Sequence, residues 1–150
     1  MFKIFYEDIE PGHTDTFGNY KVSKEEIIDF ATKYDPQPFH LNEEFAKHSV
    51  FGGLCASGWH TCSMMMRMMV DRMMETGLAG LGSPGLDKVA WKKPVFPDDT
   101  LSVQSTITEK RESKSRPNIG LVKSSHEIIN QKGEVVAEVH SNIMVAKRNA

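Results

Sequence analysis

The hydrophobic and polar positions divide the chain into a first half that favours helices and a second half that favours strands. Residues 14–22 predict a short strand or loop. Ser23 and Glu26 then fit a capping box, in which the serine accepts from the third helical amide while the glutamate reaches back. An amphipathic helix of about ten residues should follow. It should end near Tyr34, because Pro36 disfavours helical geometry at the residue before it.

The longest predicted helix spans residues 59–75 and ends at Gly77. Apolar side chains, many of them methionine, occupy nearly every face of this helix, so we expect the surrounding structure to bury it. The methionines are typical of adaptable core packing, and a metal or cofactor site is the less favoured alternative. A short helix over residues 42–47, capped by Asn42, should precede it.

The second half of the chain alternates with the period of β-strands. Four strands are predicted, over residues 86–93, 101–109, 119–129 and 135–145. A turn over residues 130–133 should join the last two strands. Helices followed by mostly sequential strands indicate an antiparallel α+β sheet rather than a parallel, doubly wound one. The prediction is a single domain over residues 1–150, in which one sheet wraps around one buried helix.

The glycines of residues 80–85 are spaced like a dinucleotide-binding fingerprint. That motif must follow a strand and open a helix, whereas this segment follows a helix and precedes a strand. We therefore expect it to be a connecting loop.

The composition restricts the classes of function. The chain has 39% hydrophobic and 25% charged residues and a net charge of −2, which provides no field to attract nucleic acid or an anionic membrane. Cys55 and Cys62 form neither a zinc-binding spacing nor a disulfide framework, and two reduced thiols favour the cytoplasm. The N-terminus has acids where a signal peptide needs an apolar run. The most apolar stretch, residues 64–74, is too short to span a bilayer.

Residues 34–40 are the segment that points most clearly to chemistry. Pro36 and Pro38 stiffen the connection between two predicted helices. A rigid loop can hold the Asp35 carboxylate and the His40 imidazole on one water at low entropic cost. An imidazole near its usual pKa exchanges a proton at neutral pH, and a nearby carboxylate favours its charged form. The spacing alone leaves an alternative open: a helix-terminating turn in which Asp35 caps the next helix and His40 lies at the surface.

Three motifs resemble those of MaoC-like dehydratases and (R)-specific enoyl-CoA hydratases. They are FATKYDPQPFHLNEEFA (residues 30–46), GLCASG (residues 53–58) and WKKPVFPDD (residues 91–99). The motifs occur in the family's order and spacing, and the resemblance runs from about residue 8 to the end of the chain. It implies the hotdog fold, an antiparallel β-sheet wrapped around a long central α-helix.

The resemblance also implies which residues act. Asp35 and His40 would be the catalytic acid/base pair, and the amide of Gly58 would donate to the thioester oxygen as negative charge develops there. Gln37 and Ser57 would contact the substrate; the best-known hydratases have Asn and often His at these places. Ser57 as the N-cap of the long helix is an equally weighted alternative.

Lys92 and Lys93 are candidate contacts for the phosphates of coenzyme A. A solvated basic face explains the same residues and is the favoured alternative.

The reaction implied is the addition of water to, or its removal from, an enoyl or 3-hydroxyacyl thioester, with (R) stereochemistry. The acyl group would be carried on coenzyme A or acyl carrier protein, and neither a metal nor a cofactor is expected. Because family members pair their sheets edge to edge, we expect a homodimer or a larger even-numbered oligomer. From the composition, we expect the protein to be cytoplasmic and to have no nucleic-acid or membrane partners. The alternatives are a hotdog thioesterase, which attacks the carbonyl with water, and a non-catalytic acyl-CoA-binding subunit.

Overall fold

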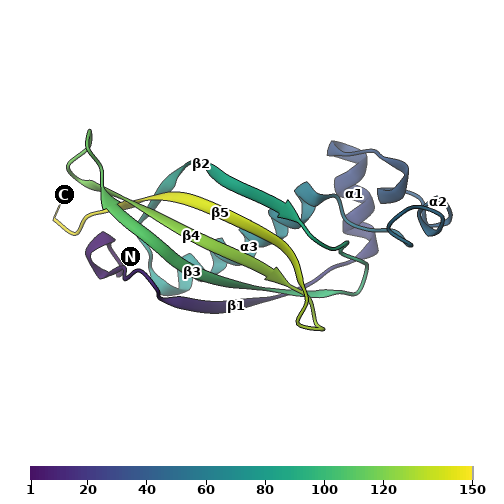
Figure 1. Cartoon of the computed structure of the whole chain (residues 1–150), viewed down its shortest axis with the longest axis horizontal. Helices are drawn as coiled ribbons and strands as arrows, with labels where there is room; N and C mark the ends of the chain where they lie inside the picture. The colour runs from purple at the N-terminus through teal and green to yellow at the C-terminus, as the bar shows by residue number, and fades with distance from the viewer. Residues whose placement is uncertain (150) are drawn as a thin grey trace.

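A five-stranded antiparallel sheet curves around one long helix, which confirms the predicted α+β class (Figure 1). The computed structural model describes residues 1–149. The strands are β1 (Thr14–Lys21), β2 (Gly80–Trp91), β3 (Thr100–Glu112), β4 (Ile119–Ile129) and β5 (Val135–Ala146). Their order in the sheet is β1-β3-β4-β5-β2, and every neighbouring pair is antiparallel.

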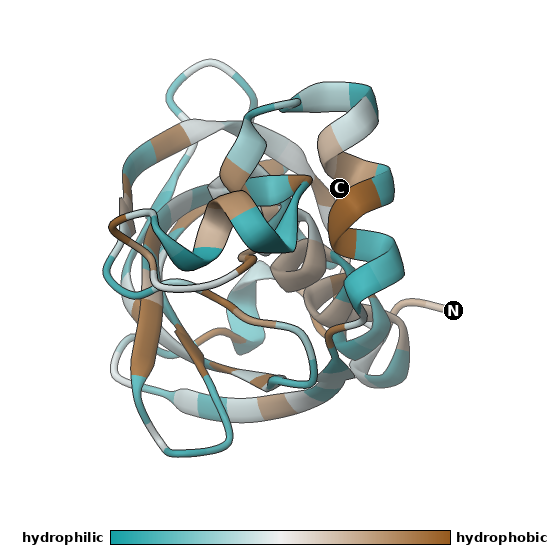
Figure 2. Cartoon of the chain, turned by 90° about the vertical axis from the view of Figure 1, so that its right-hand side faces the viewer, coloured by the Kyte–Doolittle hydropathy of each residue, from teal (hydrophilic) through white to brown (hydrophobic). Residues whose placement is uncertain are grey.

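The helices lie on one face and at one end of this sheet (Figure 1). They are α1 (Lys24–Tyr34), α2 (Glu43–Lys47) and α3 (Gly58–Thr76), with single 3-10 turns at Tyr6–Asp8 and Pro38–His40. Helices α1 and α2 lie at one end of the sheet, and both chain termini lie at the other. Figure 2, viewed from the end with α1 and α2, shows the sheet curving around α3.

Helix α1 begins and ends where the sequence predicts, but its capping box is only half formed. The Oγ atom of Ser23 accepts from the amide of Glu26 at 3.1 Å. The predicted return bond from Glu26 is wrong, because its carboxylate accepts from Tyr20 and His60 instead.

Helix α3 is buried on one side only. It ends at Gly77, whose φ of 77° is left-handed, as expected of a glycine after a helix. The buried residues are His60, Thr61, Met64, Met65, Met68 and Met69. Four apolar residues on the other side, Trp59, Met66, Val70 and Met74, are 38% to 79% exposed. The expectation that this helix is buried all round is therefore wrong for the chain by itself.

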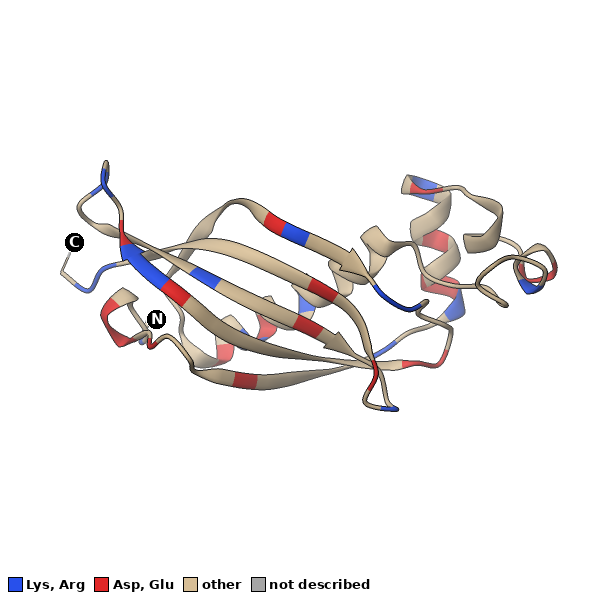
Figure 3. Cartoon of the chain, in the orientation of Figure 1, with Lys and Arg blue, Asp and Glu red and all other residues tan. Residues whose placement is uncertain are grey.

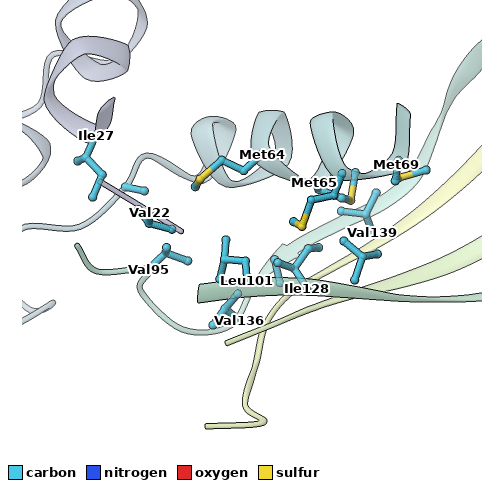
Figure 4. Packing of buried hydrophobic residues seen from close by; sticks show 14 of the residues in the cluster. Val22, Ile27, Met64, Met65, Met69, Val95, Leu101, Ile128, Val136 and Val139 are labelled. Carbon is cyan, nitrogen blue, oxygen red and sulfur yellow. The ribbon is translucent and has the colours of Figure 1, made fainter. Parts of the chain in front are cut away.

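The hydrophobic core lies between α3 and the sheet (Figure 4). Met64, Met65 and Met69 point from the helix toward the strands. They meet branched aliphatic side chains such as Leu101 and Ile128, which are fully buried. Flexible thioether side chains fill an irregular space of this kind well. The prediction that the methionines pack the core is confirmed for Met64, Met65, Met68 and Met69, and it is wrong for the exposed Met66 and Met74.

Strand β2 corrects the expectation of a loop over residues 80–85, because the strand already begins at Gly80. Its register against β5 shifts at Gly82 and Gly85, which have φ values of 109° and 156°. Such positive φ values strain any residue other than glycine, and irregular pairing of this kind is typical of bulged edge strands. The glycines therefore allow a distorted strand rather than a loop.

A buried histidine links the three central strands. His126 of β4 is 3% exposed. Its ring nitrogens lie 2.6 Å from Ser105 Oγ of β3 and 2.7 Å from Ser141 Oγ of β5. Burial, and to a smaller extent the charge of His140, lowers the pKa of His126 from 6.5 to about 4. The neutral ring is thus the form that the fold stabilises.

We expect the stability of the protein to decrease as His126 is protonated. The folded chain binds this proton more weakly than the unfolded chain, so the stabilisation is complete above pH 6.5 and is lost as the pH falls to about 4. The loss should amount to about 3 kcal/mol in the free energy of unfolding, measured by urea titration at several pH values. The His126→Gln variant should show a shallower pH dependence; an unchanged slope would contradict the prediction.

Candidate active site

The candidate acid/base pair lies on the connection that leaves α1. Asp35 is the C-cap residue of α1, and its φ of −150° and ψ of 68° are outside the helical region. This conformation is expected of a residue that precedes proline. Pro38–His40 then form a 3-10 turn, in which the carbonyl of Phe39 accepts from the amide of Cys55 at 3.3 Å. The two prolines thus restrict the backbone of the segment that carries Asp35 and His40.

The alternative of a simple surface turn is wrong. Helix α2 is capped by Asn42, whose Oδ1 atom accepts from the amide of Phe45 at 2.9 Å, as predicted. Asp35 does not serve that helix. His40 is only 5% exposed and therefore is not a surface residue.

Asp35 and His40 face one another across a gap. The Oδ2 atom of Asp35 lies 3.4 Å from Nε2 of His40. The other ring nitrogen, Nδ1, lies 2.7 Å from the carbonyl oxygen of Cys55. Because a carbonyl only accepts, Nδ1 carries a proton, and in a neutral ring Nε2 is then an acceptor. Two acceptors separated by more than a normal hydrogen bond are suited to share one water.

The neighbours of Asp35 favour its charged form. Its Oδ1 atom accepts from the side-chain amide of Gln37 at 2.7 Å. Burial raises the pKa of the Asp35 carboxyl, but the hydroxyl of Ser57, the amide of Gln37 and the charge of His40 together lower it below its usual value. The carboxylate is therefore ionised at neutral pH.

Ser57 is fully buried beside this carboxylate. It occupies the N-cap position of α3, but its side chain does not cap the helix. Its Oγ atom has no hydrogen-bond partner of normal geometry within residues 1–149, but the hydroxyl lies close enough to the Asp35 carboxyl to lower its pKa. The side-chain capping role considered for Ser57 is thus wrong, and its hydroxyl lies at the candidate site.

Gly58 begins α3, where the amides of the first turn have no partner inside the helix. Its carbonyl accepts from Nε1 of Trp91 at 2.9 Å. The indole lies so close that a Cβ atom at position 58 would be 2.4 Å from the Trp91 ring. Glycine is therefore needed here for packing as well as for its implied role. Trp91 belongs to one of the three sequence motifs, but no local signal in the sequence indicates that it lies over a residue 33 positions away.

The structure does not bring Lys92 and Lys93 into the Asp35–His40 cluster. Nζ of Lys92 lies 2.8 Å from Glu138 of β5, and Lys93 pairs with Glu134. Both lysines are about half exposed. Figure 3 shows charges of both signs interspersed over the sheet. This setting is that of a solvated face, and a contact with phosphate stays a prediction.

Within residues 1–149, no three His, Cys, Asp or Glu side chains are placed to hold a metal ion. None of the helices described is both long and apolar enough to cross a membrane.

The comparisons with known proteins agree with the fold and the motifs. The family model described as a MaoC like domain matches residues 8–128. The crystal structure of a MaoC-like dehydratase from Rhodospirillum rubrum has a TM-score of 0.88 and 38% identity, covering 99% of this chain and 100% of that one. The 3-hydroxybutyryl-CoA dehydratase of Methylorubrum extorquens is 25% identical over 91% of this chain and 84% of its own length. The (R)-specific enoyl-CoA hydratase of R. rubrum is 28% identical over 69% of each chain. The predicted family and its hotdog fold are confirmed.

Proposed function

The chain belongs to the family of MaoC-like domains, and on this basis we propose that it adds water reversibly to an enoyl thioester, forming a 3-hydroxyacyl thioester. Two of its relatives are, by name, a dehydratase and a hydratase of acyl-CoA thioesters. The observation that carries the proposal is the 3.4 Å separation between Oδ2 of Asp35 and Nε2 of His40, next to the first turn of α3. A carboxylate and an imidazole at this spacing can hold and ionise one water.

His40 acts as the base in the proposed hydration. Its Nε2 atom takes one proton from the water while the water oxygen bonds to Cβ of the substrate. The electron pair of the C=C bond moves toward the thioester oxygen. The hydrogen bond from Nδ1 to Cys55 keeps the ring in the tautomer that this step needs. The ionised Asp35 orients the water and stabilises the imidazolium that forms.

The amide of Gly58 stabilises the intermediate. The thioester oxygen gains negative charge as water adds, and the first turn of α3 offers unpaired N–H groups and a partial positive charge. His40 then returns its proton to Cα, which restores the thioester and the neutral imidazole. The hydroxyl and the proton added both come from one water, and dehydration is the reverse. The scheme requires neither a metal nor a cofactor.

The substrate class follows from the same proposal. We propose a thioester of coenzyme A or acyl carrier protein and an (R) product, as in the hydratase relative. When the protein is added to crotonyl-CoA, or to longer or branched enoyl-CoA thioesters, the enoyl absorbance should fall and no free thiol should be released. An (R)-specific dehydrogenase coupled to the product should respond, and an (S)-specific one should not. Release of thiol without hydration would instead identify a thioesterase, and binding without either reaction an acyl-CoA-binding subunit.

We also propose that the chain forms a homodimer or a larger even-numbered oligomer. A second copy of the chain would shield the exposed apolar side chains of α3 and the unpaired edge of β2 from water. Light scattering should show at least twice the mass of one chain at micromolar concentration. The Met66→Glu/Val70→Glu variant should dissociate, because it buries two charges in the interface. Ser115→Glu, at an exposed turn, is the control. An active monomer would rule the proposal out.

A further inference from the structure

Next to the proposed catalytic pair lies a second polar cluster, which the mechanism above does not use. Glu26 of α1 accepts hydrogen bonds from the hydroxyl of Tyr20 of β1 and from Nε2 of His60 of α3, the latter at 3.1 Å. Phe30, one turn further along α1, stacks on His60 with ring centroids 4.8 Å apart and planes within 9°. His60 is 3% exposed. We refer to Tyr20, Glu26, Phe30 and His60 as the α1–α3 cluster.

The α1–α3 cluster joins the two helices that carry the candidate site. Glu26 and Phe30 belong to α1, of which Asp35 is the C-cap. His60 belongs to the first turn of α3, which Gly58 begins. A shift of α1 along α3 would therefore move the Asp35 carboxylate relative to the Gly58 amide. A misplacement of about 1 Å can cost about 100-fold in rate.

Ile27 and Ala31 of α1 are fully buried and pack the helix against the core, but the face with Glu26 and Phe30 is less closely packed. All four residues of the α1–α3 cluster line a pocket of about 240 Å³ between the helices. Dispersion contacts across an open space of this kind are lost. On this face the directed contacts, which are the hydrogen bonds to Glu26 and the ring stack, add to the core packing in defining the position of the helix.

The protonation state of the cluster suits such a role. A carboxylate only accepts, so Nε2 of His60 carries the proton that bonds to Glu26. The Nδ1 atom is buried without a hydrogen-bond partner within residues 1–149. Burial lowers the pKa of His60; Glu26 opposes this change and the charge of His40 adds to it. Burial and Glu26 raise the pKa of Tyr20 to about 12, so its hydroxyl remains a donor. The ring of His60 is thus held in its neutral form.

We propose that His60 and Glu26 are positioning residues, whose hydrogen bond holds the carboxylate of Asp35 at a set distance from the amide of Gly58. The inference rests on the proposed hydration. The hydrogen bond between His60 and Glu26 lies outside the reacting groups, yet under this proposal it contributes to the rate of hydration as well as to the stability of the fold. Loss of the bond should lower kcat and leave KM nearly unchanged, because the groups that bind the thioester are untouched.

The test compares matched variants of the full chain. Glu26→Leu and His60→Phe should lower kcat about 10- to 100-fold with KM within about 3-fold of the wild type. Glu26→Gln keeps an acceptor for both donors and should lower kcat less than about 5-fold. His126→Phe replaces an equally buried histidine of the sheet and should lower the unfolding temperature with little change in kcat. If Glu26→Leu does not fold, Tyr20→Phe removes a single donor and should show a smaller fall in kcat.

A second measurement separates failure of this inference from failure of the proposed function. The ¹⁵N resonances of the His40 ring should shift in Glu26→Leu and not in His126→Phe, whether or not the chain hydrates thioesters. If the wild-type chain has no hydratase activity, the proposed function is refuted. The His40 resonances then still test whether Glu26 positions the candidate site. Equal losses of kcat in His60→Phe and His126→Phe, or an unchanged His40 ring in a folded Glu26→Leu variant, would overturn the inference.

Discussion

Asp35→Asn and His40→Asn should each lower the turnover of enoyl thioester at least about 100-fold while the chain stays folded, because each removes one of the two groups that we propose hold and ionise the water. Asparagine has the shape of aspartate but no charge to orient the water and stabilise the imidazolium. At position 40 asparagine is preferable to alanine, since its amide can still donate to the buried carbonyl of Cys55. Initial rates from enoyl absorbance, together with unfolding midpoints, measure both effects.

The control for this pair is His48→Asn, at a histidine whose side chain is 80% exposed and pairs with Glu44. It should keep wild-type turnover. The assignment of the acid/base pair would be wrong if the folded Asp35→Asn and His40→Asn variants hydrated the thioester at near wild-type rates.

The second large effect is expected at Gly58, where the amide itself can be removed. Position 58 is the first residue of α3, which is the helical position that tolerates proline best. Ser57 has φ −54° and ψ 142°, a conformation that suits a residue before proline. Gly58→Pro thus deletes the N–H group with little backbone strain. Loss of an oxyanion donor should lower kcat about 10²- to 10³-fold.

The matched comparison must remove the collision with Trp91, because any Cβ atom at position 58 meets that ring. In a Trp91→Ala background, Gly58→Ala and Gly58→Pro both add a Cβ atom, and proline in addition replaces the N–H group with its ring carbons. We expect similar unfolding midpoints and a turnover that is about 10²- to 10³-fold lower for proline than for alanine. Equal turnover of the two would mean that Gly58 serves only to make room for Trp91.

Much of this protein is encoded locally. The Ser23 and Asn42 caps and the helix end at Gly77 lie where the sequence places them. Each of these features depends on neighbours within one turn of helix, so a short stretch of chain suffices to predict it. Asp35 and His40 share one proline-stiffened loop, so their nearness along the chain is local; the setting of each also depends on Cys55 and Ser57, and their catalytic role stays a prediction.

Tertiary contacts determined the rest. Glu26 could have completed its capping box, but its carboxylate binds His60, 34 residues away. Residues 80–85 look like a loop and form a strand, because β5 offers them hydrogen-bond partners and their glycines accept the distortion.

The same reason explains the site. Trp91 lies over Gly58 because β2 ends beside the start of α3. Which side of α3 stays exposed depends on which side the sheet covers. A local pattern states which conformation a segment prefers and which side chains are apolar. The partner that each side chain meets depends on segments far apart in the chain, and so it is decided by the packing of the whole fold.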